Sequence, residues 1–173
     1  MGTINNYKGE IVEEPSELEF NRALQLLKQK VSGKEISTSN VLQDIYRLWD
    51  DWTAPAISVF SCQNGCSACC YLFTQVTKLE AEYIKGGLAG LSKERKKAIR
   101  SWSHKTLALI EKISASVKRH SDLEDKYLRK QVPCIFLKSS KCTIYDFRPL
   151  NCRAHLVLNN PHACRTIGQP RFL

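Results

Sequence analysis

The chain has 173 residues, of which 43% are hydrophobic and 25% charged, a composition that fits a folded globular domain and excludes a disordered or collagen-like chain. No run of about 18 apolar residues is present, which excludes a transmembrane helix. The formal net charge is +9, but eight cysteines bound as thiolates to two Zn²⁺ ions would bring it to about +5, so the basic excess alone does not indicate a nucleic-acid-binding protein.

We expect one domain, with a helical amino-terminal part over residues 1–58 and a cysteine-cluster, metal-binding part over residues 59–173. The first fourteen residues are polar and lack the apolar core of a secretory signal, so we expect a cytoplasmic protein. Thiols in that compartment are kept reduced. The eight cysteines therefore favour metal binding or redox chemistry over a disulfide framework.

Two helices are predicted in the amino-terminal part. The first covers residues 13–32, where Ser16 and Glu19 form a capping-box pattern next to Pro15 and apolar residues follow at helical spacing. The second covers residues 39–52. Neither helix carries a reactive group, so we expect both to be packing elements.

The first cysteine group lies in residues 62–70, whose sequence is CQNGCSACC. Its Gly65 suits a loop whose backbone folds around an ion. The β-branched and aromatic residues that follow predict a short strand over residues 71–76. Thr77 and Glu80 form another capping box, which predicts that a helix begins there.

A long helix is predicted over residues 93–119, with Ser92 as its N-cap. One face is apolar, and the rest of its surface carries seven basic residues: Lys93, Arg95, Lys96, Lys97, Arg100, Lys105 and Lys112. Such a face is usually solvated, and its alternative use is contact with nucleic acid or an acidic partner. No aromatic array accompanies it, which argues against binding of single strands.

The last segment is rich in Pro, Ser and Asn and contains the second cysteine group, Cys134, Cys142, Cys152 and Cys164. Here we predict loops, a short hairpin around residues 135–144 and a helical turn near residues 148–155. The expected fold class is mainly α: a small helical domain with cysteine-rich loops and a short β-hairpin around a metal site. The fold must bring the two cysteine groups together.

The strongest chemical signal is that all eight cysteines fall into two groups of four. Thiolates at short spacing, such as Cys66 and Cys69, can converge on one ion, and they suit zinc and iron–sulfur ligation alike. The alternatives are buried apolar cysteines and a redox dithiol, although the βαβ unit that usually carries such a dithiol is missing. The expected metal ligands are Cys62, Cys66, Cys69, Cys70, Cys134, Cys142, Cys152 and Cys164.

Cys69 and Cys70 are adjacent, and adjacent side chains diverge, so the two rarely serve one ion symmetrically. We expect one to bind the primary centre while the other reaches a second ion, bridges two ions or stays free. His155 and His162 lie close to the last two cysteines and are alternative ligands.

Cys62, Cys66 and Cys69 also have the spacing associated with radical S-adenosylmethionine enzymes, whose three cysteines hold a [4Fe–4S] cluster. Those enzymes resemble a βα barrel, for which this chain is too short and has too little alternation of strands and helices. The spacing still favours these three positions as cluster ligands.

Five segments carry a resemblance to a known family: the cysteines of residues 62–70, VTKLE at 76–80, PCIFL at 133–137, KCTIY at 141–145 and RPLNCR at 148–153. Together they resemble the zinc- or iron-chelating cysteine-cluster (CxxxCxxCC) domains, a family that includes flagellin lysine N-methylase. The resemblance spans roughly residues 60–156.

This resemblance implies that the seven cysteines from Cys62 to Cys152 ligate a metal or cluster, and Cys164 brings the count to eight. Arg148 and Arg153 would bind the cofactor by donating hydrogen bonds to sulfur or by neutralising an anionic cluster. The alternative for either arginine is a salt bridge to Asp146 or another acid.

An iron–sulfur cluster of the [4Fe–4S] type is the first expectation, because a Cys-x-x-x-Cys-x-x-Cys run stands beside an extra thiol. Zn²⁺ is the alternative, because eight thiolates fill two closed tetrahedral sites. The metal centre then supports a modification reaction on a protein substrate, or it is structural in a module that contacts nucleic acid or an acidic protein through the lysine-rich helix. The sequence assigns no catalytic residue.

Overall fold

The structure is a computed structural model, which describes residues 3–5, 8–14, 16–31, 38–62, 65–158, 160, 161 and 164. The side chains of residues 30, 31, 38 and 39 are not described. In these ranges the fold is mainly α, as predicted, with six α-helices: α1 (Glu17–Val31), α2 (Thr38–Thr53), α3 (Lys78–Ala89), α4 (Lys93–Ser114), α5 (His120–Lys130) and α6 (Leu150–Arg153). Three short 3₁₀ helices are η1 (Ala54–Val59), η2 (Ala68–Tyr71) and η3 (Tyr145–Phe147).

Two small antiparallel hairpins complete the described secondary structure. In the first, β1 (Thr3–Asn5) pairs with β2 (Ile11–Glu13), a hairpin that the sequence analysis did not predict. In the second, β3 (Leu137–Lys138) pairs with β4 (Lys141–Cys142), which confirms the hairpin predicted around residues 135–144.

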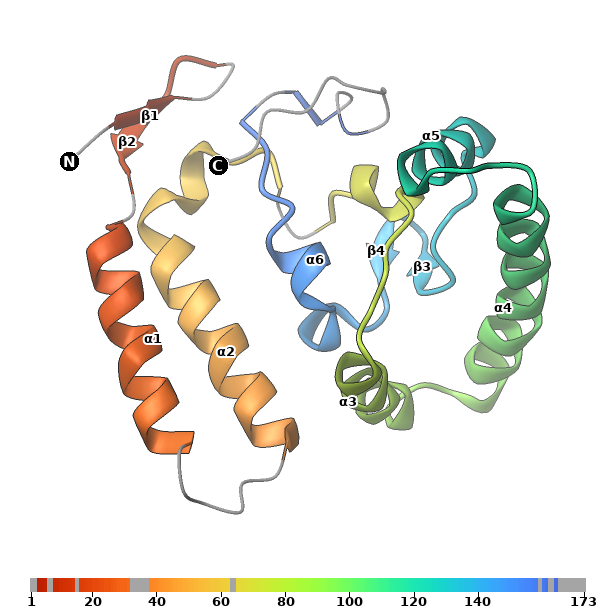
Figure 1. Ribbon diagram of the computed structural model, residues 1–173, viewed down its shortest axis with the longest axis horizontal. Coiled ribbons are helices and arrows are strands. Elements are labelled where there is room, and N and C mark those ends of the chain that lie inside the picture. Colours follow the sequence, from red (N-terminus) through yellow and green to blue (C-terminus); the bar gives the residue numbers. More distant parts are fainter. Residues whose placement is uncertain are drawn as a thin grey trace.

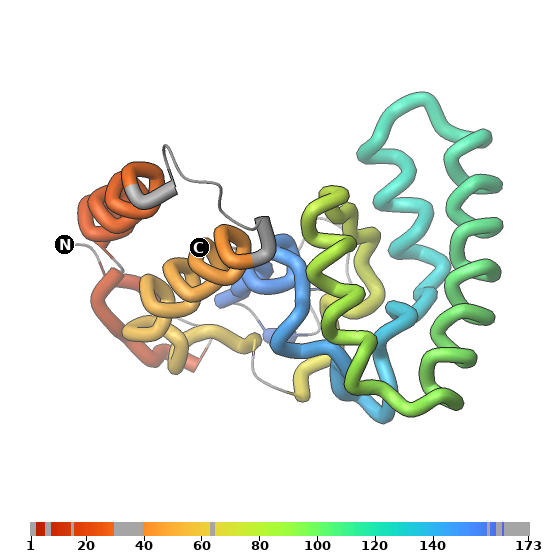
Figure 2. The backbone as a smooth tube through the Cα atoms, turned by 90° about the horizontal axis from the view of Figure 1, so that it is seen from below, coloured from red at the N-terminus to blue at the C-terminus, as the bar shows by residue number. Residues whose placement is uncertain are grey.

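The helices form two pairs on opposite sides of a loop-rich centre. Figure 1 shows α1 and α2 side by side at one end, and α4 and α5 side by side at the other. Helix α6 and the β3–β4 hairpin lie between the pairs, and Figure 2 shows the same order from a second direction. Helix α3 contacts α2 and η3, so it closes one side of the centre.

The predicted caps begin the helices as expected. The Thr77 hydroxyl accepts a hydrogen bond from the Glu80 amide (3.2 Å), and the Glu80 carboxylate accepts one from the Thr77 amide (2.8 Å), which completes the capping box of α3. The Ser92 hydroxyl accepts from the amide of Arg95 in the same way at the start of α4.

The amino-terminal boundary of α1 differs from the prediction. The Ser16 hydroxyl caps α1 through the amide of Glu19, but Glu13 belongs to β2 and the helix begins only at Glu17. Pro15 lies outside the described residues.

Two further predictions were wrong in the carboxyl-terminal part. Residues 71–76 form no strand: η2 ends at Tyr71, and the chain continues extended to the cap of α3. A strand requires a partner, and the β3–β4 hairpin pairs only with itself. The helix predicted over residues 93–119 ends at Ser114, and a separate helix, α5, follows.

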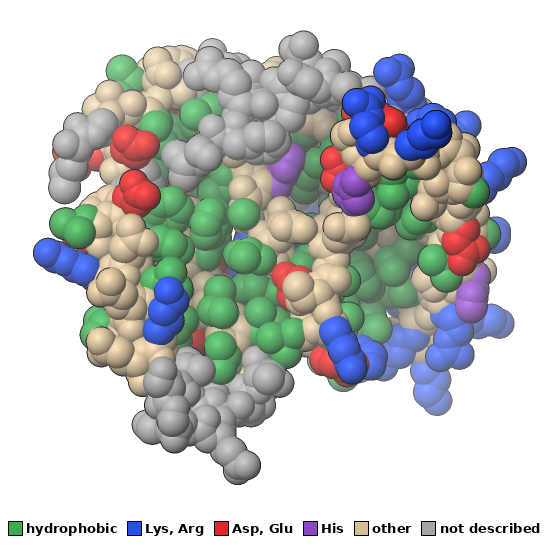
Figure 3. All heavy atoms as spheres, in the orientation of Figure 1, with side chains coloured by type: hydrophobic (Ala, Val, Ile, Leu, Met, Phe, Trp, Pro, Cys, Tyr) green, Lys and Arg blue, Asp and Glu red, His purple; other side chains and the backbone are tan. Residues whose placement is uncertain are grey.

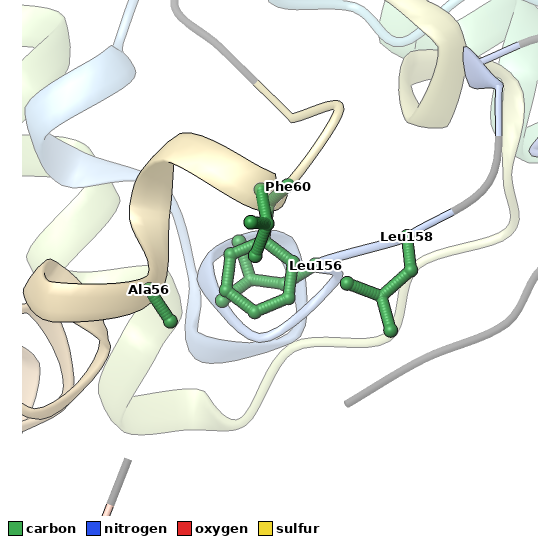
Figure 4. Packing of buried hydrophobic residues seen from close by; sticks show 5 residues of the cluster. Ala56, Phe60, Leu156 and Leu158 are labelled. Carbon is green, nitrogen blue, oxygen red and sulfur yellow. The ribbon is translucent and has the colours of Figure 1, made fainter. Parts of the chain in front are cut away.

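Two apolar clusters position the centre. Ala56, Val59 and Phe60 at the end of η1 pack against Leu156 and Leu158, as Figure 4 shows. The backbone agrees, because the Ser61 amide donates to the Val157 carbonyl (2.9 Å). The segment that leads to the first cysteine group is therefore fixed beside the segment that leads to the last cysteine.

The second cluster joins α4 to α5. Ile113, Leu123 and Tyr127 are buried together, and Phe73 from the extended segment packs against them. This cluster anchors the α4–α5 pair on the chain that follows the first cysteine group.

Candidate metal centre

The first cysteine group lies on a loop and a 3₁₀ turn. Gly65 has a φ of +98°, which only glycine adopts readily, as expected for this loop. Helix η2 carries Cys69 and Cys70, and the Cys70 amide donates to the Ser67 carbonyl (3.1 Å). Residues 63 and 64 lie outside the described part of the chain.

A backbone hydrogen bond connects the second cysteine group to this turn. The Cys134 amide donates a hydrogen bond to the Cys70 carbonyl at 2.6 Å. Cys142 lies at the end of β4, and Cys152 lies on α6. Cysteines that are far apart in sequence are therefore neighbours, as the two groups of four required.

Backbone amides point at several of the sulfurs. The amides of Phe136 and Leu137 donate to Cys134, and the Ile144 amide donates to Cys142. Burial raises the pKa of both thiols, whereas these N–H groups favour the thiolate and oppose that shift. Sulfurs with built-in amide donors are suited to carry the negative charge that a metal ligand needs.

One neighbourhood of thiols contains Cys62, Cys66 and Cys164, which pack together with Ala68 and Val157. Burial raises the pKa of Cys62 to about 11 and that of Cys164 to about 12. These pKa values include the repulsion of Cys66 and Cys69 on Cys62, and of Cys62, Cys66 and Cys69 on Cys164. The three cysteines repel one another as thiolates because the fold packs them together.

A second neighbourhood contains Cys134, Cys142 and Cys152. Burial, and then the charges of Cys69, Cys134 and Cys142, raise the pKa of Cys152 to about 12. The pKa of Cys70 is also raised, first by a hydrogen bond with Cys69, with Cys134 and Cys142 contributing repulsion. Three cysteines of the second group thus gather with Cys70, whereas the fourth, Cys164, lies in the first neighbourhood.

Cys69 lies where the two neighbourhoods meet. Its hydrogen bond with the Cys70 thiol lowers the pKa of Cys69 to about 7 against the effect of burial. Its charge acts on Cys62 and Cys164 in one neighbourhood and on Cys134 and Cys152 in the other. The surroundings of the two adjacent cysteines therefore differ, while their separate roles as ligands stay a prediction.

Arg148 is the cation that faces the thiols. Its positive charge lowers the pKa of four of them: Cys62, Cys69, Cys142 and Cys152. Its guanidinium lies 4.0 Å from the centre of the Tyr145 ring, which holds it in place. The position suits the charge-neutralising role expected for this residue.

Arg153 is buried and turned to other partners. It donates to the Asp50 carboxylate (2.6 Å), to the Asp146 carbonyl (2.6 Å) and to the Arg148 carbonyl (3.2 Å). Its guanidinium also lies 4.5 Å from the centre of the Tyr46 ring. Arg153 thus has the salt bridge considered as the alternative, and it fixes the backbone on which Arg148 stands.

Glu80 helps to position the cysteines through hydrogen bonds to distant residues, which the sequence did not reveal. Besides capping α3, its carboxylate accepts from the Leu150 amide (2.8 Å) and the Tyr46 hydroxyl (3.2 Å). Burial opposes its charge, but the amide hydrogen bonds hold the pKa of Glu80 below its usual value. The carboxylate therefore anchors the start of α6, which carries Cys152, and the capping motif alone signalled its presence.

The described thiols lie near one another, but their sulfur atoms do not converge on a common centre. Among the described residues, no three Cys, His, Asp or Glu side chains form a group that could hold a metal ion. Burial lowers the pKa of His155, which favours the neutral imidazole that metals bind, and its carbonyl accepts from the Cys62 thiol (3.0 Å). His162 lies outside the described residues.

Comparison with known proteins gives one match. The family model CxxCxxCC, described as "Putative zinc- or iron-chelating domain", matches residues 61–165, a range that includes all eight cysteines. No curated protein and no solved structure matches the chain. In the part of the chain that the structure describes, no helix is both long and apolar enough to cross a membrane.

Proposed function

The chain belongs to this family of zinc- or iron-chelating domains, and we propose that its eight cysteines are the chelating ligands. The observation that carries the proposal is the hydrogen bond from the Cys134 amide to the Cys70 carbonyl, which holds the backbone of the second cysteine group beside that of the first. Amide N–H groups aimed at sulfur and the charge of Arg148 support it, because both stabilise thiolates.

Ligation requires the sulfurs to turn toward a shared ion. The staggered positions about each Cα–Cβ bond give that freedom, and a bound cation replaces the repulsion between thiolates by attraction. We propose that Cys62, Cys66 and Cys164 contribute to one side of the centre, and Cys134, Cys142 and Cys152 to the other. Cys69 and Cys70 then join the two sides.

We propose an iron–sulfur cluster of the [4Fe–4S] type as the bound group. The Cys62, Cys66 and Cys69 spacing supports it, together with burial and amide donors at sulfur, which are the features that tune such clusters. The alternative is two Zn²⁺ ions, which the two thiol neighbourhoods favour because structural zinc takes four thiolates per ion.

The test is anaerobic purification followed by visible absorbance, iron, sulfide and zinc analysis. A brown protein with equal iron and sulfide is expected. A colourless protein with two zinc ions per chain would replace the cluster by the alternative. A protein without any bound metal after reconstitution would overturn chelation by these cysteines.

Cys69→Ser and Cys70→Ser variants refine the same measurement. Since Cys69 acts on both neighbourhoods, its loss is expected to lower the metal content more than the loss of Cys70. Ser67→Ala on the same turn is the matched control and should keep the full metal content. Equal losses in the two cysteine variants would contradict distinct roles.

For the use of the centre, we propose support of a modification reaction on a protein substrate. The motivation is the sequence resemblance to a family that includes a methylase. A hollow lined by Asp50, Tyr145, Arg148 and Arg153 adjoins the thiols through Arg148 and gives a substrate a place of approach. Incubation of the loaded protein with candidate proteins and S-adenosylmethionine, followed by mass spectrometry, tests it, and the absence of any modified residue contradicts it.

We also propose that residues 1–173 fold as one domain. The 2.6 Å ion pair between Asp50 and Arg153 and the cluster around Phe60 join the amino-terminal helices to the cysteine loops. A single unfolding transition of the loaded protein is expected, whereas two separate transitions would contradict a single domain.

A further inference from the structure

The positive charge of the chain is concentrated in one segment. Residues 93–130, which form α4, α5 and their connection, contain twelve Lys and Arg against five Asp and Glu, a net charge of +7 out of the total of +9. Figure 3 shows these basic side chains gathered over α4 and α5, at the end of the molecule away from α1. The remaining 135 residues are almost neutral, with a net charge of +2.

A regular row of cations runs along α4. Lys93, Lys97 and Arg100 are separated by four and three residues, so they share one face of the helix. All three are exposed, and within the described part of the chain their side chains make no hydrogen bond or ion pair. We call Lys93, Lys97 and Arg100 the basic stripe.

The opposite face of α4 is fixed to the cysteine loops. Arg95 donates to the carbonyls of Ile135 (3.0 Å) and Leu137 (3.2 Å), and the Trp102 indole donates to the Pro133 carbonyl (3.1 Å). These carbonyls flank Cys134, so the loops that carry the thiols also hold the helix. The basic stripe is therefore presented outward on a rigid support.

One residue of the stripe opposes the stability of its own helix. The amino-terminal end of a helix carries a partial positive charge that falls off within the first turn, and Lys93 is the first residue of α4. Glu94 is the acidic residue of the first turn of α4, and Lys93 is its immediate neighbour. The cation that lowers the pKa of Cys69 and Cys142 is Arg148, which is not part of the stripe. Neither helix stability nor balance of the thiolates accounts for the stripe.

We propose that the basic stripe docks the sugar–phosphate backbone of a double-stranded nucleic acid. Successive stripe residues rise by about 6 and 4.5 Å along the helix, a linear array that suits a strand with one phosphate per about 3.4 Å of axis. Contacts to phosphates position a protein on the duplex without carrying sequence information, so binding through the stripe is independent of sequence.

An acidic protein is the less suitable partner because the binding energy of protein interfaces is concentrated in a few well-packed, desolvated anchors, most often large aromatic residues and Arg. The large exposed apolar residues described on α4 are Trp102, whose indole N–H is already bonded, and Leu107, beyond the end of the stripe. A single strand is also less suitable, because the stripe offers no aromatic platform on which bases stack.

The experiment uses the full-length, metal-loaded chain and fluorescein-labelled 20-base-pair duplexes of mixed sequence, one of DNA and one of RNA, with the single strands of each for comparison and polyglutamate as a competitor. Anisotropy is measured over a range of salt concentrations. The triple variant Lys93→Gln, Lys97→Gln, Arg100→Gln should bind more weakly, and the slope of log K against log salt should fall by about three. Arg22→Gln, Arg47→Gln, Lys85→Gln removes the same charge from exposed positions elsewhere and should leave the slope unchanged.

Metal analysis and melting of each variant keep the two proposals separate. The triple variant should retain its metal and melt no lower than the wild type, because the three exposed side chains make no hydrogen bond or ion pair in the described part of the chain and Lys93→Gln relieves repulsion in the first turn of α4. Equal binding by variant and wild type, absence of duplex binding at low salt, tighter binding of the single strand, or full competition by polyglutamate would each overturn the proposal. Preference for the DNA or for the RNA duplex supports it and identifies the source of the phosphates.

Discussion

The helical pairs and the cysteine loops of this protein are stabilised in different ways. Helices α4 and α5 are held by a side-chain cap and a buried cluster around Ile113, and α1 packs on α2 through Phe20, whose ring centre lies 4.8 Å from that of Trp52. The loops contain two-residue strands, short 3₁₀ turns and buried cysteines, which would repel one another as thiolates. From this difference we expect the helical pairs to keep their structure without a metal, whereas the loops would need a bound cation.

Removal of the metal is the largest test of this comparison. Stripping the metal anaerobically should cost on the order of 10 kcal/mol of stability in the loops, the scale known for structural zinc sites. In hydrogen exchange, the amides of Cys134 and Thr143, which bond to the Cys70 and Phe136 carbonyls, should lose protection. The amides within α1 and α4 should keep theirs. Loss of protection throughout the chain in one step would contradict independent helical pairs.

The ion pair between Asp50 and Arg153 tests the joint between the two kinds of region. Asp50→Asn leaves the Arg153 guanidinium, whose side chain is 7% exposed, without its counter-charge. Loss of a fully buried partner lowers the free energy of unfolding by about 3–5 kcal/mol. Because the Asp50 side chain is 49% exposed, we expect the variant to lose about 2 kcal/mol. Chemical denaturation measures it. Asp51→Asn, at the exposed neighbouring position, should change little, and equal midpoints for the two variants would contradict the role of Asp50.

Two adjacent glycines in α3 give a sharper comparison. A Cβ on Gly87 would lie 2.7 Å from Cγ of Phe147 in η3, whereas a Cβ on Gly86 meets that ring only at an ordinary 3.5 Å. Gly87→Ala should therefore destabilise the protein by about 1–3 kcal/mol. Gly86→Ala should stabilise it by about 0.5–1 kcal/mol, because alanine favours the helix. Thermal melting measures the stability of both variants. A change of the same sign in both would contradict this close approach of α3 and η3.

The sequence predicted what is local and missed what is not. Thr77 and Glu80 predicted the start of α3, because a capping box involves only four neighbouring residues. Helix α5 was missed although Leu123, Tyr127 and Leu128 lie on its buried side, because its short apolar pattern is interrupted by charges. The strand predicted over residues 71–76 was wrong because β-propensity cannot supply a partner.

The same limit applies to the candidate site. Spacing and residue type predicted the cysteines as ligands, and the fold places them in neighbouring loops, while ligation itself stays a prediction. The contacts that position them join residues too distant for any local pattern, such as Asp50 and Arg153, which are 103 residues apart. Glu80 was found as a cap, but its bond to Leu150, 70 residues away, required the structure.

The smallest expected effect concerns the turn between β3 and β4. Ser139 and Ser140 have φ values of +48° and +61°, the left-handed pair that a two-residue type I′ turn requires and that Asn-Gly adopts most easily. Ser139→Asn with Ser140→Gly should therefore stabilise the hairpin by about 0.5–1 kcal/mol. Because β4 ends at Cys142, the gain should appear mainly in the metal-free protein, whose loops lack other support. Hydrogen exchange of the Thr143 amide measures this gain in stability. Faster exchange than in the wild type would show that the two serines are not the strained element of the loop.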